Sequence, residues 1–129
     1  MNILFLGVLE DKPYLYALKQ AINAEGLGHK CVVNFEIADT LTEVAMKARS
    51  RQCTHVITTQ QKLIPKLCST ASSKEQTIDN YAGSVLWDEK HDIEYLIVHP
   101  LKQVMTKSYG QFLLDRYVSK FTKQSKWRF

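Results

Sequence analysis

Seven Lys or Arg side chains fall between Lys102 and Phe129, with aromatic side chains interleaved among them. Only Asp115 opposes these cations, so the segment carries a formal charge of 7 − 1 = +6, against +4 for the whole chain. Cations attract phosphate groups by Coulomb force and counterion release, and aromatic faces stack on nucleobases. The segment therefore predicts a phosphate-binding surface, with Tyr109 and Trp127 as stacking residues. The expected phosphate contacts are Lys102, Lys107, Arg116, Lys120, Lys123, Lys126 and Arg128.

A second chemistry is suggested by the acidic side chains Asp79, Asp88 and Glu94. In metal-dependent nucleases, carboxylates on neighbouring strands hold Mg²⁺ while a Lys stabilises the developing charge. Glu94 has no Lys two residues on, and the Asp88-Glu89-Lys90 run has that spacing inside an expected turn. Solvated turn residues are the alternative interpretation of these acids.

Other catalytic and cofactor signatures are missing from the sequence. There is no GxGxxG or GxxxxGK[ST] loop, no HExxH and no GxSxG. The cysteines Cys31, Cys53 and Cys68 are odd in number and form no CxxC pair, so they predict buried free thiols and not a zinc site or a disulfide framework. We expect no cofactor and no resident metal.

The elements that must position these residues begin with an alternating first half. Apolar runs at residues 3–9, 31–37 and 54–58 predict buried strands, and each is followed by a helical pattern. Thr40 and Glu43 have the capping-box spacing at the start of one helix. Strand and helix alternation favours right-handed βαβ crossovers and a parallel sheet.

The second half predicts a hairpin followed by a basic helix. A polar loop spans 69–79, strands are expected at 81–87 and 93–99, and the turn 88–92 joins them. The last helix is expected from Thr106 or Ser108 to about Phe121. Its core stripe is predicted to be Tyr109, Phe112, Leu113, Tyr117 and Phe121. Gly110 within it predicts close approach of another backbone or of a ligand.

These patterns together predict one α/β domain over residues 1–129. Its expected form is three-layer-like: a mostly parallel sheet from the first half, a hairpin added from about residues 81–99, and a basic C-terminal helix. The loop 69–79 is the expected place for any sub-boundary.

No apolar run approaches the ~20 residues of a membrane helix. Met1–Leu9 has no basic region before it, so it is not a typical signal peptide. We therefore expect a cytoplasmic protein without membrane contact.

Three stretches of the second half resemble a known family. They are Asn80-Tyr-Ala-Gly-Ser84, His99-Pro-Leu101, and Tyr109-Gly-x-Phe-Leu-x-x-Arg-Tyr-x-Ser-Lys120. Over about residues 80–127 the chain is similar to a segment near the N-terminus of replicative DNA polymerases of tailed bacteriophages. The palm carboxylates and the fingers helix of those enzymes have no counterpart here. The resemblance implies a replication setting in a host cytoplasm and contact with DNA or a replication protein, and it transfers no catalytic residue.

The function expected first is therefore non-catalytic DNA or RNA binding, as an accessory protein of a phage-type replication or processing assembly. A small metal-dependent nuclease that uses Asp79, Asp88 and Glu94 is one alternative. The other is a protein-interaction module or inhibitor that docks through its basic aromatic tail, with Trp127 and Phe129 as anchors.

Overall fold

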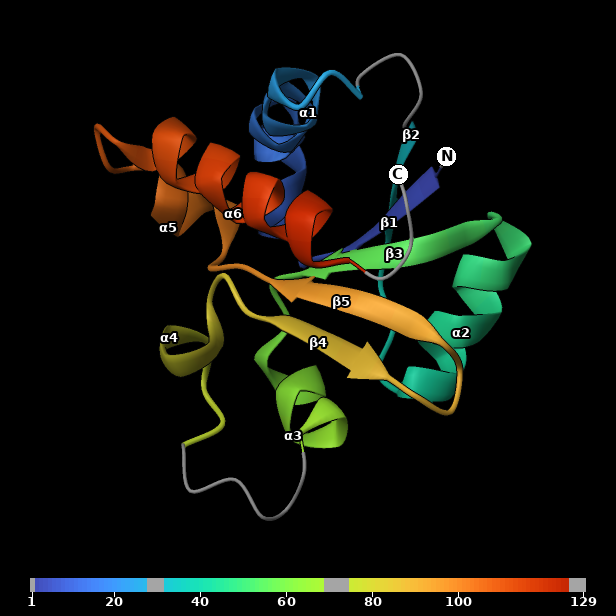
Figure 1. The fold of residues 1–129 in the computed structure, drawn as a ribbon. Coiled ribbons are helices and arrows are strands. Elements are labelled where there is room, and N and C mark those ends of the chain that lie inside the picture. Colours follow the sequence, from blue (N-terminus) through green and yellow to red (C-terminus); the bar gives the residue numbers. More distant parts are fainter. Residues whose placement is uncertain (1, 28–31, 69–74, 126–129) are drawn as a thin grey trace.

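The computed structural model describes residues 2–27, 32–68 and 75–125, and these residues are built around one five-stranded sheet (Figure 1). The strand order is β2-β1-β3-β5-β4. The pairs β1–β2, β1–β3 and β3–β5 are parallel, and β4 joins β5 as an antiparallel hairpin. The predicted α/β fold, with a mostly parallel sheet and an added hairpin, is confirmed. The strands are β1 (Asn2–Leu6), β2 (Val32–Glu36), β3 (Cys53–Thr58), β4 (Val85–Asp88) and β5 (Ile93–Ile97).

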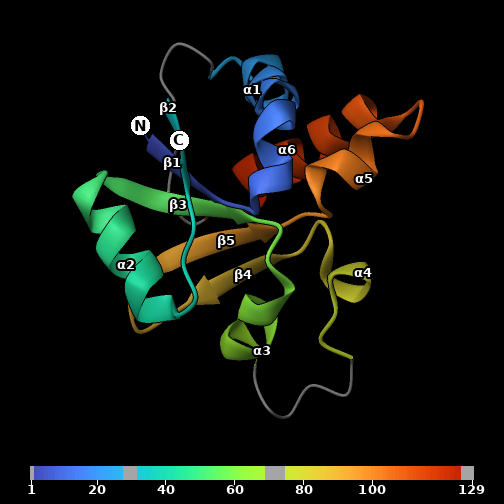
Figure 2. The same ribbon diagram turned by 180° about the vertical axis from the view of Figure 1, so that it is seen from behind.

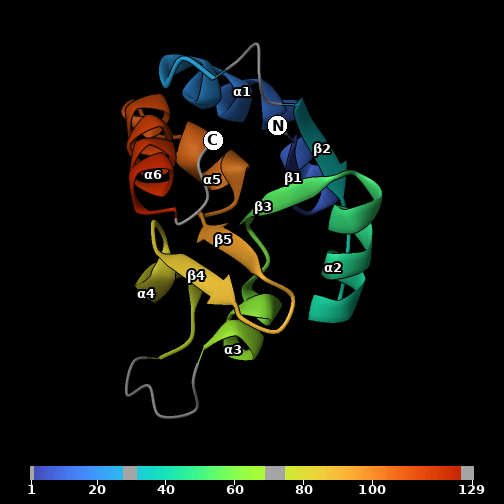
Figure 3. The same ribbon diagram turned by 45° about the vertical axis from the view of Figure 1, so that its right-hand side comes forward.

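Helices cover both faces of this sheet. On one face lie α1, α5 and α6, and on the other α2 and α3, an arrangement that can be followed in Figures 1 to 3. The helix bounds are α1 (Leu15–Ala24), α2 (Leu41–Ser50), α3 (Ile64–Leu67), α4 (Ile78–Tyr81), α5 (Leu101–Met105) and α6 (Gly110–Gln124), with short 3₁₀ helices η1 (Leu9–Tyr14) and η2 (Gln61–Leu63). None of the helices in the described ranges is long and apolar enough to cross a membrane.

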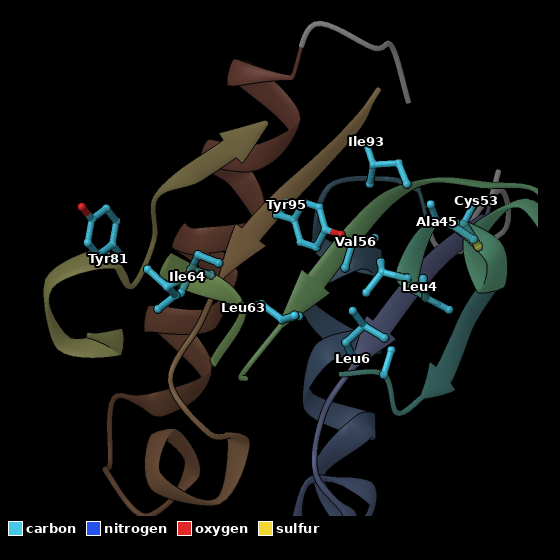
Figure 4. Close-up of a cluster of buried hydrophobic side chains, with 14 of the residues drawn as sticks. Leu4, Leu6, Ala45, Cys53, Val56, Leu63, Ile64, Tyr81, Ile93 and Tyr95 are labelled. Carbon is cyan, nitrogen blue, oxygen red and sulfur yellow. The ribbon is translucent and has the colours of Figure 1, made fainter. Parts of the chain in front are cut away.

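Each face of the sheet has its own hydrophobic core. Along β5, Tyr95 and Ile97 point to the α2 and α3 side, where they join Leu4, Leu6 and Val56 (Figure 4). The intervening Leu96 points to the other side, under α1 and α6. This alternation follows from the two-residue period of a strand.

The predicted cap of α2 is present. The Thr40 hydroxyl accepts a hydrogen bond from the Glu43 backbone N–H at 3.1 Å. This bond satisfies one of the free N–H groups at the helix start and fixes where α2 begins.

The strand expected over residues 81–87 is shorter than predicted. Tyr81 belongs to α4, where it and Ile78 are buried in the α2 and α3 side core. Gly83 follows with φ +85°, a left-handed conformation that favours glycine, and the strand begins only at Val85. The apolar residues before this turn form a helical turn because their three-residue spacing places both against the core.

Asp11 ties together three loops at the edge of the sheet where β1, β3 and β5 end. Its carboxylate is fully buried. Oδ2 accepts from the Val8 N–H at 2.9 Å and from the Thr59 hydroxyl at 2.7 Å, while Oδ1 accepts from the Leu101 N–H at 2.9 Å. The loops that follow these three strands are therefore held by one side chain.

Candidate nucleic-acid interface

Helix α6 packs on α1 and on the sheet through one narrow face. The buried residues of this face are Gly110, Leu114, Val118 and Phe121. Of the predicted stripe, Phe121 is confirmed as a core residue. Leu113 and Tyr117 are only half-buried, and Tyr109 and Phe112 are 55% and 63% exposed, so the rest of the stripe was misplaced around the helix axis. Leu114 and Val118 are smaller than the aromatic residues, and they fit the space directly above the sheet.

Gly110 brings two helices together, as its position in the sequence indicates. A Cβ atom on Gly110 would lie 2.1 Å from the carbonyl oxygen of Val104 in α5. Only glycine permits this separation. The contact fixes the start of α6 against α5.

The described cations of α6 line a hollow of about 570 Å³. Arg116, Lys120 and Lys123 stand on its helical wall, and Ala82 and Gly83 form part of the opposite wall. The Tyr117 ring packs against Gly83, where a Cβ would lie 2.8 Å from a ring carbon. Burial raises the pKa of the Tyr117 phenol, so this side chain is neutral at physiological pH.

A second hollow of about 310 Å³ continues along the same helix toward its start. It is lined by Lys107 and Tyr109 and, across from them, by Asp79 and His99, whose side chains pair at 3.1 Å. Leu113 lines both hollows, so they adjoin each other along α6. We call the two together the basic furrow.

The cations of the furrow are not neutralised within the described chain. Elsewhere, Lys47 and Arg51 bind Glu36, and Lys62 pairs with Asp39. No ion pair of residues 2–27, 32–68 and 75–125 includes the cations of α5 and α6 or the loop between them, which are Lys102, Lys107, Arg116, Lys120 and Lys123. All five side chains are exposed. These cations are therefore available to bind an external anion.

Two exposed aromatic rings accompany these cations. The guanidinium of Arg116 lies 5.9 Å from the centre of the Phe112 ring, and the Lys107 ammonium lies 5.7 Å from the centre of the Tyr109 ring. Tyr109 is 55% exposed, as its predicted stacking role requires. Phe112 was predicted to be a core residue, but it is exposed beside Arg116, although it lines neither hollow. The four-residue spacing of Phe112 and Arg116, which places them on one helix face, was the available signal.

The remaining residues of the predicted surface are more scattered. Lys102 is exposed on α5 but does not line either hollow of the furrow. Lys126, Trp127 and Arg128 lie outside the described residues.

The acids of the nuclease alternative occupy three different environments. Asp79 is exposed in α4 and pairs with His99. Asp88 is buried at the far end of β4, where it accepts bonds from both the backbone N–H and the Nδ1 of His91. Glu94 is buried in β5. In the part of the chain that the structure describes, no group of three or more His, Cys, Asp or Glu could hold a metal ion. The nuclease alternative therefore gains no support from the placement of its acids.

Glu94 instead faces the buried His55 beneath the end of α6. The two residues are neighbours in the β3–β5 register. His55 Nε2 lies 2.9 Å from the Ser125 hydroxyl, and its ring meets Phe121 edge-on. Burial lowers the pKa of His55, and the Glu94 charge acts in the opposite direction. His55 thus holds the end of α6 to the sheet, and both His55 and Glu94 lie outside the two hollows of the furrow.

Comparison of this chain with protein-family models, with curated proteins and with solved structures found no match.

Proposed function

We propose that the protein binds single-stranded nucleic acid in the basic furrow and does so without catalysis, as an accessory protein. The observation that carries this proposal is the row of unneutralised cations at Lys107, Arg116, Lys120 and Lys123 along two adjoining hollows. The exposed Tyr109 ring lines one of these hollows, and the exposed Phe112 ring lies beside Arg116. Cations spaced along a groove follow a phosphate backbone, and exposed rings accept unstacked bases. A duplex keeps its bases stacked, so single strands are the expected form.

The convergence of the family-like stretches on this furrow supports a replication setting. Gly83 from the first stretch, His99 from the second, and Arg116, Tyr117 and Lys120 from the third all line it. Residues separated by more than thirty positions thus meet at one surface. The replication role and the resemblance to phage polymerases remain part of the proposal.

The test is fluorescence anisotropy with labelled single- and double-stranded DNA, without metal, over a range of salt concentrations. We expect the logarithm of the association constant to fall linearly with the logarithm of the salt concentration. Four cations on phosphates correspond to a slope of about −2.8 for a single strand, at ~0.7 per contact. The double substitution Arg116→Ala/Lys120→Ala should reduce the slope by about 1.4. For constants that converge near 1 M salt, this is a roughly 60-fold weaker affinity at about 50 mM.

A matched control separates the furrow from net charge. The double substitution Arg49→Ala/Lys90→Ala removes the same charge from exposed side chains outside the furrow. We expect this variant to bind within about twofold of the parent, because surface charges beyond the ~10 Å Debye length are screened. Equal losses in the two variants would show that attraction is nonspecific. No binding at micromolar protein and low salt would overturn the proposal.

The aromatic contribution can be measured separately. Phe112→Ala should weaken binding to single strands at every salt concentration and leave the slope unchanged, because stacking is not electrostatic. The expected loss is about 1–3 kcal/mol for one stacked base. An unchanged affinity would remove Phe112 from the interface.

A further inference from the structure

A separate crevice opens at the carboxyl edge of the parallel strands, between β1 and β3. The chain leaves β1 through η1 toward the α1 face, and it leaves β3 through η2 toward the α3 face. Connections that diverge to opposite faces leave a gap between two adjacent strands, and open α/β sheets bind ligands at this point. The crevice has a volume of about 500 Å³, within the range of small-molecule sites. It shares no lining residue with the basic furrow.

The walls of this crevice are apolar although they face solvent. Val8 is 43% exposed, Leu9 66% and Ile37 45%, and all three line it together with Ile78. Burying exposed aliphatic side chains under an apolar ligand is favourable, because it removes apolar surface from water. The crevice therefore favours a ligand whose main part is apolar.

The floor of the crevice contains an unsatisfied acceptor. Gln60 lines the crevice and is only 6% exposed. Its Nε2 donates to the Gly7 carbonyl at 2.9 Å, but Oε1 is buried and has no hydrogen-bond partner among the described residues. A buried acceptor without a partner costs free energy, and such groups are few in native proteins. The last torsion of a Gln side chain is soft, so the amide can turn toward a donor that enters the crevice.

The charge around the crevice disfavours anions. In doubly wound sheets the backbone N–H groups after the first strand hold phosphate, but here the Asp11 carboxylate already occupies the Val8 N–H. Glu10 lines the crevice as a second acid, and the Lys62 ammonium on its wall is paired with Asp39. The local balance is negative, so a phosphate or carboxylate ligand meets repulsion.

We propose that this crevice binds a small, mostly apolar molecule that carries an N–H donor and no negative charge. The apolar part covers Val8, Leu9 and Ile37, and the donor satisfies Gln60 Oε1. A cationic donor gains further attraction from Glu10. The site is independent of the basic furrow and of nucleic-acid binding.

Four benzene derivatives of similar size test each element of this chemistry. Benzamide has the ring and a neutral N–H donor, benzamidine adds positive charge, N,N-dimethylbenzamide has no N–H, and benzoate is an anion without a donor. Binding is followed by ¹H–¹⁵N chemical shifts of the labelled protein. We expect benzamidine and benzamide to bind with Kd values of about 1–10 mM, as ligands of this size do. Their largest shifts should fall at residues 7–10 and 59–62, and the other two compounds should bind at least tenfold more weakly.

Substitutions that fill the crevice show whether binding occurs there. Ile37→Trp and Val8→Trp place an indole in the hollow from two different walls, so one of them remains informative if the other fails to fold. Met46→Trp is the control, since Met46 is 65% exposed on α2 and does not line the crevice. Loss of benzamide binding in the folded crevice variant but not in the control supports the site. Binding that persists, equal binding of N,N-dimethylbenzamide or benzoate, or no shift with benzamide at about 10 mM overturns the proposal.

Discussion

Replacing Asp11 by Ala tests whether one carboxylate holds the three loops at the edge of the sheet. The substitution removes the acceptor for the Val8 N–H, the Leu101 N–H and the Thr59 hydroxyl. The bonds from Leu101 and Thr59 are buried, whereas the bond from Val8 is part-buried, and water can replace that one. The free-energy cost therefore comes mainly from two donors that lose their partner inside the protein.

Each such donor costs about 1–3 kcal/mol, so Asp11→Ala should lower the free energy of unfolding by about 2–6 kcal/mol. Asp11→Asn should lower the free energy of unfolding by less, because the amide keeps one acceptor oxygen. It should still be destabilising, because its NH₂ group then faces a backbone N–H, and two donors cannot bond. At ~2.1 cal/mol/K per residue, the unfolding entropy of a chain of this length is about 0.27 kcal/mol/K. A loss of about 2 kcal/mol then lowers Tm by roughly 7 °C.

Urea denaturation of the three proteins, fitted with a common slope, measures these differences. Glu89→Ala is the control, because Glu89 is exposed and should change stability by less than about 0.5 kcal/mol. The expected order of stability is parent, Asn variant, Ala variant. A loss below about 1 kcal/mol for Asp11→Ala would refute the assignment of this carboxylate as a structural junction.

Two further predictions concern buried polar groups. Because burial lowers the pKa of His55 in the folded state, His55 binds a proton more readily in the unfolded chain. The contribution of His55 to the free energy of unfolding should therefore be constant above about pH 6.5, its ordinary pKa. Below that pH it should fall by up to ~1.4 kcal/mol per pH unit, until the folded-state pKa is reached. Urea midpoints between about pH 7.5 and 5.5 should show a flatter profile in His55→Gln, and parallel profiles would contradict this origin. The buried Tyr95 hydroxyl has no partner in the described part of the chain, so Tyr95→Phe should leave the free energy of unfolding unchanged or raise it by up to ~1 kcal/mol; a loss of more than about 1 kcal/mol would show that the hydroxyl is satisfied.

The fold was largely predictable because local signals and burial agree in most elements. Short apolar runs became the strands of a parallel sheet, and Thr40 fixed the start of α2. Gly110 was correctly linked to close backbone approach, since Val104 lies against it. One exception is Tyr81, whose apolar neighbours were compatible with either a strand or a helical turn. Contacts with the distant core decided that choice, and the local sequence does not contain them.

The candidate site was predictable in its charges but not in its shape. Counting cations identified Arg116, Lys120 and Lys123, and the structure places them along one hollow. The opposite wall comes from Gly83, which contributes through the absence of a side chain against Tyr117. Such a contact depends on tertiary packing. The crevice above Gln60 could not be foreseen for the same reason, because its walls come from loops that follow three different strands.

The order in which the chain is synthesised gives the packing of α6 on α1 a further consequence. Gln111 donates to the Ala17 carbonyl and Thr122 to the Glu25 carboxylate, so the helix made latest among the described elements covers one of the earliest. Until α6 has been translated, the core between α1 and the sheet lacks Leu114, Val118 and Phe121 and is only partly covered. The opposite core, which α2 and α3 close, needs no residue of α6. A nascent chain can thus complete the α2 and α3 side core once β5 has been made, whereas the half that carries the basic furrow closes only after α6 has been made.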